Sequence, residues 1–479
     1  MSNANAIRGG KVTILDALRE AVVTMLAAIA TLLCTLSIAH GPGPAVLSVV
    51  LCLSLSRSQL DRDWRHRIEA AIALPVVGLA AVGVGLLLLH SPWLGAAVFV
   101  AGMFASIWLR RFGPNAQRAG SLIALPFVAL LVTPHVSAAE AGAVPPLLLP
   151  VIVALLALLW VGALHALAVR IGLLPRPRIA RQPRATPKPA RESGMRPIVS
   201  TRMAIQMGLA LAISFAVGYV FFAQHWAWIV LTAFIVISGN RGRLDVAYKS
   251  VLRVAGAAGG TILALAIDTH IGAHDSATAM MILAAIFIGI WLRPLGYAWW
   301  ALCVTIALAL LQGFADAPPA QILLPRLEEI IIGAIIGVAV AWWVFPVRST
   351  GVLRRRIADA LALLGAALDP AAEERTPDDF IAAVADAEQI APAFRASRLV
   401  TRHLRKLRDA QPADWIDALV ACRNPAVMLI ESGATPTDVR RAVGAARKAL
   451  TEPATLSSAL QELRGLLSAM PRVPQAAET

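Results

Sequence analysis

Charged residues are scarce in this sequence. Asp, Glu, Lys and Arg make up 15% of its 479 residues, whereas 58% of the residues are hydrophobic and the mean hydropathy is +0.70. A soluble protein of this length needs many more polar residues to cover its surface, so most of this chain must face lipid. The sequence therefore predicts an all-α integral membrane protein.

The motifs of soluble enzymes and of metal sites are lacking. The sequence contains no phosphate-binding Gly loop with a Lys, no His-Glu-x-x-His, no Cys-x-x-Cys and no nucleophile elbow. The stretch "AGAAGGT" at 255–261 is followed by no Lys and opens an apolar run, so we expect its glycines to let helices pack closely. We expect no enzyme activity, no cofactor and no metal. The cysteines lack metal-ligand spacing, and packing is the expected role of all four: Cys34, Cys52, Cys303 and Cys422.

Long apolar stretches, in contrast, recur along the first 345 residues. Their lengths approach or exceed the roughly 18–20 residues that cross a bilayer. The segments near residues 50 and 232 are short and bounded by Pro or Gly, and paired short spans are typical of the binding region of a transporter. About twelve spans are expected, with centres near residues 30, 50, 80, 100, 128, 157, 212, 232, 262, 284, 305 and 336.

The basic residues are distributed unevenly between the loops. Of the 25 Lys and Arg residues before position 346, 24 fall on alternate loops, and Arg326 alone breaks the pattern. The positive-inside rule then places both termini in the cytoplasm and predicts an even number of spans in an inner (plasma) membrane. Because short basic loops beside a membrane explain the net charge of +14, no nucleic-acid partner is expected. The basic segments are the N-terminus, 57–69, 110–118, 170–202, 241–253 and Arg293.

Two motifs occur twice at nearly the same spacing. "SIWLRRFGP" at 106–114 returns as "GIWLRPLGY" at 289–297, and "SRSQLDRDWRHR" at 56–67 aligns with "NRGRLDVAYKSV" at 240–251. Unrelated matches have no reason to share a register. We therefore expect two six-span units of parallel orientation, because an even number of spans preserves direction.

The regions between and after these units differ in composition. A linker at 171–201 separates a first unit at 1–170 from a second at 202–346, and from Arg170 to Arg202 there are nine basic residues, one acidic residue and six prolines. Such a composition favours solvated, extended chain, which can contact anionic headgroups or dock for regulation. Residues 347–479 are predicted to be a cytoplasmic domain of four to six helices.

Helix-start signals are clear in this last region. "RTPDDF", "QPADW" and "ATPTDVRR" each place a polar residue before Pro and then acidic residues, as helix N-termini prefer. The charge of 18 basic and 16 acidic residues over 346–479 is too balanced for a nucleic-acid module. The expected inward-facing residues are Leu361, Leu363, Leu364, Ile381, Val384 and Ile390.

One region resembles a known family. "HWAWIVLTAFIVISGNRGRLDVAYKSVLRVAGAAGGTILAL" at 225–265 is similar to the signature region of the fusaric-acid-resistance and aromatic-acid-exporter family. The resemblance is good over about 200–345, weaker over 15–170 and absent from the tail. It implies six-span units with cytoplasmic helical regions and export of aromatic carboxylic acids. The plant aluminium-activated malate transporters, which are anion channels, resemble the family distantly.

The candidate pathway residues are cationic or aromatic. Arg110 and Arg293 end matching apolar runs, and with Arg57 and Arg241 they are predicted to guard the inner mouth of an anion pathway, the alternative being plain positive-inside anchoring. Trp226 and Trp228 can stack on an aromatic substrate or form an interfacial belt. Further polar candidates are His225, which can relay protons or serve as a loop residue, Gln206 and His165 within spans, and Asp61 and Asp245, expected to pair with a neighbouring Arg.

These features predict an inner-membrane exporter of small organic anions, including aromatic carboxylic acids. A passive anion channel and a non-transporting membrane scaffold are the alternatives, and a major facilitator is disfavoured because "GNRGRLDVAYK" departs from that family's loop motif. The expected partners are the lipid bilayer and the anion. Homo-oligomerisation and accessory export subunits stay open.

Overall fold

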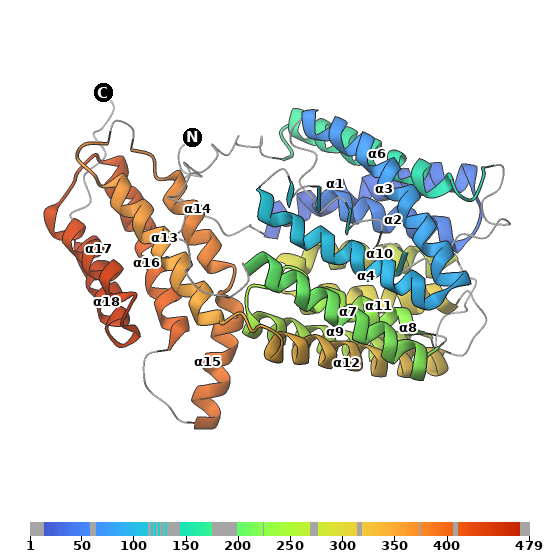
Figure 1. Ribbon diagram of the computed structural model, residues 1–479. Helices are drawn as coiled ribbons and strands as arrows, with labels where there is room; N and C mark the ends of the chain where they lie inside the picture. The colour runs from blue at the N-terminus through green and yellow to red at the C-terminus, as the bar shows by residue number, and fades with distance from the viewer. Residues whose placement is uncertain are drawn as a thin grey trace.

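The computed structural model describes residues 14–57, 64–113, parts of 116–131, and 144–174, 199–223, 225–268, 276–313, 319–372, 375–405 and 411–469. Every regular element within these residues is a helix, which confirms the all-α class. Figure 1 shows a bundle of near-parallel apolar helices with a second, C-terminal bundle at one end of it.

The apolar helices follow the expected spans closely. Eleven of the twelve expected centres fall inside a helix, and the centre near 128 lies in a stretch that is described only in part. Short 3-10 turns follow two of the helices: η1 (Leu109–Phe112) follows α4, and η2 (Arg293–Leu295) follows α10. The helices are α1 (Ile14–Ile38), α2 (Pro42–Arg57), α3 (Trp64–His90), α4 (Pro92–Trp108), α6 (Leu149–Arg170), α7 (Val199–Phe221), α8 (Trp226–Ile237), α9 (Arg243–Asp268), α10 (Ser276–Leu292), α11 (Tyr297–Gly313) and α12 (Pro319–Trp343).

Six of these described helices are long and apolar enough to cross a membrane, and others are shorter apolar helices. Large hydrophobic side chains lie exposed on their surfaces, as Leu33, Ile262 and Met280 do at 63%, 68% and 72%. Such an apolar exterior requires lipid. The six are Ile14–Ile38, Pro92–Phe112, Leu149–Arg170, Val199–Phe221, Arg243–Ala266 and Ala277–Leu295, and the shorter ones are Gly43–Ser56, Pro75–His90, Trp226–Ile237 and Tyr297–Leu311.

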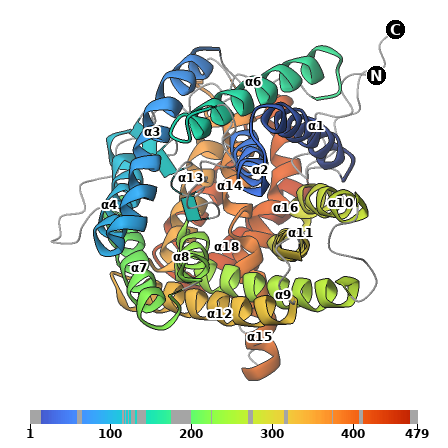
Figure 2. The same cartoon turned by 90° about the vertical axis from the view of Figure 1, so that its right-hand side faces the viewer.

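The apolar helices form a ring around shorter ones. Seen along the helix axes, α6, α1, α10, α9, α12, α7, α4 and α3 follow one another around the bundle, with α2 and α8 inside (Figure 2). Between the N-terminal and C-terminal sets, α4 packs on α7 and α10 packs on α1. The shared core of α3, α4, α7, α8 and α12 includes Phe99, Phe215 and Val230.

Glycines allow the closest helix crossings in the second half of the bundle. A Cβ on Gly256 would lie 2.6 Å from the Ala298 carbonyl oxygen, and a Cβ on Gly260 would lie 2.7 Å from the Leu302 carbonyl oxygen. The glycine-rich stretch therefore serves the contact of α9 with α11, as the sequence predicts. A Cβ on Gly333 of α12 would likewise lie 2.5 Å from the Ile229 carbonyl oxygen of α8.

The C-terminal bundle has its own hydrophobic core. Leu361, Leu364, Val384 and Ile390 are buried there as expected, whereas Leu363 and Ile381 are half-buried. The three predicted helix starts fall at the beginnings of α14, α16 and α17, and Gln411 and Asp414 form a capping box. Its described helices are α13 (Ser349–Ala367), α14 (Asp378–Glu388), α15 (Ala391–Arg405), α16 (Pro412–Glu431), α17 (Thr437–Ala449) and α18 (Pro453–Ala469).

The four cysteines are packing residues or lie near the surface of a helix. Cys52, Cys303 and Cys422 are buried, and Cys34 is half-buried. In the C-terminal bundle, burial raises the pKa of the Cys422 thiol to about 11. A neutral buried thiol is a small hydrophobe, as the lack of ligand spacing predicts.

Candidate functional site

The two arginines of the repeated motif occupy equivalent positions. Arg110 lies in η1 and Arg293 opens η2, directly after α4 and α10, and both residues are exposed. Figure 2 places α4 and α10 on opposite sides of the bundle. The structure therefore does not bring these two arginines together.

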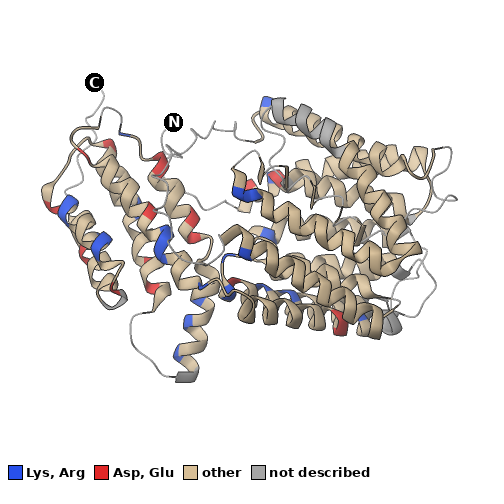
Figure 3. Ribbon diagram, viewed as in Figure 1, with Lys and Arg blue, Asp and Glu red and all other residues tan. Residues whose placement is uncertain are grey.

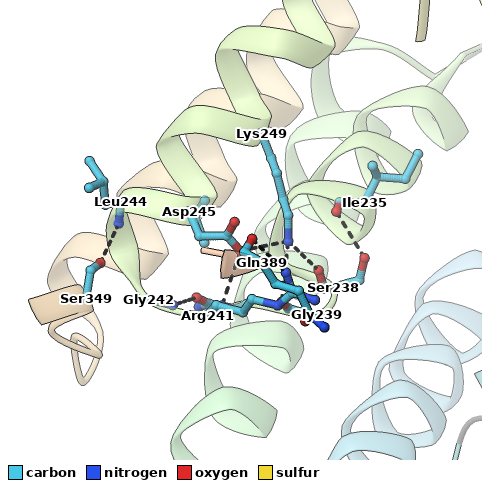
Figure 4. A network of polar contacts seen from close by, with 12 residues as sticks. Ile235, Ser238, Gly239, Arg241, Gly242, Leu244, Asp245, Lys249, Ser349 and Gln389 are labelled. Atoms are coloured by element: carbon cyan, nitrogen blue, oxygen red, sulfur yellow. Dashed lines mark hydrogen bonds and ion pairs between the residues drawn. The ribbon is translucent and has the colours of Figure 1, made fainter. Parts of the chain in front are cut away.

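Arg241 holds the loop between α8 and α9 against the C-terminal bundle. Its guanidinium donates to the Gln389 carbonyl at 3.1 Å, and its backbone N–H donates to the Asp245 carboxylate at 3.2 Å (Figure 4). Asp245 also pairs with Lys249 at 2.8 Å, so its ionic partner is a Lys rather than the expected Arg. Arg57 ends α2, and its side chain lies outside the described residues, as does Asp61.

The end of α12 is tied to α7 and to the same loop. Gln206 donates to the Val344 carbonyl at 2.7 Å and accepts a hydrogen bond from Asn240 at 3.0 Å. Phe345, the next residue, has a φ of 44°, a left-handed conformation uncommon for a non-glycine residue. Gln206 thus serves the helix-to-helix bonding that was one of its two expected roles. The Nδ1 atom of His165 is buried without a hydrogen-bond partner among the described residues.

The two tryptophans of α8 have different surroundings. Trp226 packs 5.3 Å from Phe215 and 5.4 Å from Tyr219, measured between ring centroids, within an aromatic cluster. Trp228 instead faces a charge, because the guanidinium carbon of Arg326 lies 3.8 Å from its ring centroid. Packing therefore accounts for Trp226, and Trp228 belongs to a different site.

That site is a cluster of charges buried between α8, α9 and α12. Arg326 and Glu329 of α12 are 3% and 1% exposed, and Arg253 of α9 is 2% exposed. His225, at the start of α8, places its Nδ1 3.7 Å from a Glu329 oxygen, and its side chain is 44% exposed. Charged segments are otherwise sparse along the apolar helices and gather near the C-terminal bundle (Figure 3). We call Arg253, Arg326, Glu329, Trp228 and His225 the buried charge cluster.

The cluster is incompletely hydrogen-bonded. Among the residues that the structure describes, none of the three guanidinium nitrogens of Arg326 has a hydrogen-bond partner, and neither does the Nε atom of Arg253 or one Glu329 oxygen. Buried charges in proteins are normally paired, because an unpaired one loses its hydration without compensation. The arrangement can therefore accept a further anionic group. No set of side chains suited to a metal ion occurs in the described part of the chain.

Sequence reasoning found only part of this cluster. Trp228 and His225 were candidates, whereas Arg253 was counted with a basic loop and proves to be buried inside α9. Arg326 carried a signal as the exception to the charge pattern. Glu329 had none, because only the packing of α12 against α8 shows which of the adjacent acids Glu328 and Glu329 faces inward.

Comparison with known proteins matches the part of the chain that contains the buried charge cluster. Residues 209–340 match the family model described as fusaric acid resistance protein-like, and this segment includes the whole buried charge cluster. No significant match was found among curated proteins or among solved structures. The chain is therefore a multi-pass membrane protein, and its resemblance to the fusaric acid resistance family is confirmed over residues 209–340.

Proposed function

We propose that this chain exports small organic anions, including aromatic carboxylic acids, across the inner membrane. The observation that carries the proposal is the pair of arginines, Arg253 and Arg326, buried among apolar helices of the family-matched segment. On insertion scales a cation at the centre of a membrane helix costs about 2.5–3.5 kcal/mol, so those that persist mark a pathway or a binding site. A cationic interior selects for anions.

The proposed architecture is a pair of parallel six-span units at 1–170 and 202–346, joined by a linker at 171–201 and followed by a cytoplasmic helical domain at 347–479. It is supported by α4 and α10, which are both 17 residues long and both end in a 3-10 turn. The exchanged packing of α4 on α7 and of α10 on α1 is what a two-fold relation between the units requires. In this arrangement both termini are cytoplasmic.

We also propose that Arg57, Arg110, Arg241 and Arg293 raise the anion concentration at the inner face. A surface of one sign attracts counter-charged solutes and speeds their entry. Arg110 and Arg293 are exposed and free to act in this way, while Arg241 already donates to the C-terminal bundle. Attraction over a whole face does not need the four side chains to meet.

Efflux from proteoliposomes tests the proposed function. The purified protein would be reconstituted into liposomes that are loaded with benzoate. Benzoate release would be compared with release from protein-free liposomes that hold the same benzoate, and with release of neutral benzamide. We expect release of benzoate alone. Equal release of benzoate from protein-free liposomes would refute transport. Release that ignores an imposed proton gradient and follows only the benzoate gradient would replace the exporter with the passive channel.

A further inference from the structure

We propose that the buried charge cluster is the binding site for the exported anion, that Arg326 binds the carboxylate, and that the site takes one negative charge. This inference rests on the proposed function, and it names the residues and the charge of the ligand.

The donors belong to Arg326. Its guanidinium carbon lies 3.8 Å from the Trp228 ring centroid, which is the distance of direct stacking on the ring face. Its three nitrogens are buried and have no hydrogen-bond partner among the described residues, although a guanidinium carries five N–H donors. A carboxylate matches two of these donors in the bidentate arrangement that arginine favours.

The charge is unbalanced by one. Arg253 is buried on α9, which packs on α12, so two buried cations accompany the single buried carboxylate of Glu329 on these two helices. With Glu329 ionised, two positive charges and one negative charge leave a net charge of +1. The neighbouring acid Glu328 is exposed, as is Arg243 at the start of α9, and Asp245 and Lys249 of α9 pair with each other. One carboxylate on the ligand would make the site neutral.

The walls of the site come from three packed helices. α12 packs on both α8 and α9, so Arg326 of α12 meets Trp228 of α8, and Arg253 is buried on the adjacent α9. α8 carries no Asp, Glu, Lys or Arg, and the described α7 carries only Arg202, which donates to the Phe345 and Pro346 carbonyls. His225 lies between Glu329 and solvent and adds a positive charge only when protonated.

Ligand-induced thermal stabilisation of the full chain in detergent tests this site. Benzoate, its dianionic relative phthalate, neutral benzamide and chloride would be compared. We expect benzoate to raise the unfolding temperature of the wild-type protein more than the other three do. Arg326→Gln should weaken benzoate binding by about tenfold or more, because a charge-assisted pair of hydrogen bonds is lost.

Two further variants keep the result interpretable. Arg243→Gln is the matched control, because Arg243 also lies over a tryptophan, 5.5 Å from the Trp342 ring centroid, but is exposed. It should bind benzoate as the wild type does. Glu329→Gln leaves the site with a charge of +2. We therefore expect the affinity for phthalate, relative to the affinity for benzoate, to rise by about tenfold compared with the wild type.

The outcomes separate the inference from the proposed function. Unchanged benzoate binding in Arg326→Gln would overturn the assignment of the site. An unchanged preference for benzoate over phthalate in Glu329→Gln would do the same. Neither result would contradict transport by the wild type. Chloride binding as strong as benzoate binding would overturn the carboxylate assignment. A wild-type chain that releases no benzoate from liposomes would overturn the proposed function itself.

Discussion

Single residues decide what this bundle can bind. Most of its apolar side chains are interchangeable with others of similar size, but Arg253, Arg326 and Glu329 are charged and almost fully buried. A hydropathy average over a span hides single charges, and burial depends on the helix face that meets a neighbour. This is why the sequence indicates Arg326 only as the exception to the alternation of basic loops, and assigns Arg253 to the basic segment 241–253.

At the same scale, Arg110 and Arg293 are expected to act on rate rather than on binding. Replacing both with Gln should lower the initial rate of benzoate efflux severalfold at low ionic strength and have little effect at high salt, because exposed charges are screened. Efflux from proteoliposomes at two salt concentrations measures this. Equal rates for the variant and the wild type at low salt would leave only the anchoring role.

Whole helices were easier to predict than their contacts. Long apolar runs and helix-start signals located α1–α4, α6–α12 and the starts of α14, α16 and α17, since both depend on local sequence. The opposite positions of α4 and α10 in the ring depend on long-range packing, which no local pattern specifies (Figure 2). The repeated motif therefore predicts that Arg110 and Arg293 directly follow apolar helices, but it does not predict how far apart they lie.

The crossing of α9 with α11 gives a prediction about neighbouring glycines. Gly260→Ala would put a Cβ 2.7 Å from the Leu302 carbonyl oxygen, and overpacking of this kind costs about 1–3 kcal/mol. Gly259→Ala is the matched control, because its Cβ would meet only a Leu302 methyl group at 3.4 Å. Thermal unfolding in detergent should show a lower midpoint for Gly260→Ala alone. Equal midpoints would contradict the close crossing.

The contact of α15 with α16 depends on pH. Burial alone would raise the pKa of Asp417, but hydrogen bonds from Arg395 at 2.7 Å and Arg398 at 2.8 Å hold it below its usual range. A lowered pKa stabilises the folded state above the unfolded value of about 3.9, and this stabilisation is lost as the pH falls through the folded value. Because the pair is partly exposed, the effect is about 1 kcal/mol or less.

We therefore expect Asp417→Asn to speed amide hydrogen exchange in α15 and α16 of the full chain at pH 7. The difference from wild type should narrow towards pH 3, because the stabilisation by the charged carboxylate is lost progressively below the unfolded-state pKa of about 3.9. Asp438→Asn serves as the control, because Asp438 and its partner Arg441 are 71% and 77% exposed and should contribute little. An undiminished difference at pH 3 would assign the effect to packing instead of charge.

At the scale of the whole molecule, the proposed duplication makes a prediction about sidedness. Reporter tags placed in the 57–69 loop and directly after Gly296 should both lie on the cytoplasmic face, because the first position follows the second span of its unit and the other follows the fourth span of its unit. Accessibility to a membrane-impermeant reagent in intact cells measures this. Tags on opposite faces would contradict both the duplication and the proposed inner mouth.

The buried charges lie on α9 and α12, and α12 connects them to the rest of the protein. Arg326 lies near the start of this helix. Directly after its other end, the Val344 carbonyl accepts a hydrogen bond from Gln206, and the chain then continues into the C-terminal bundle. From Arg326 to Trp343 a straight helix spans about 25 Å. Because a packed helix is stiff, any tilt of α12 that followed filling of the site would also move its connection to the C-terminal bundle.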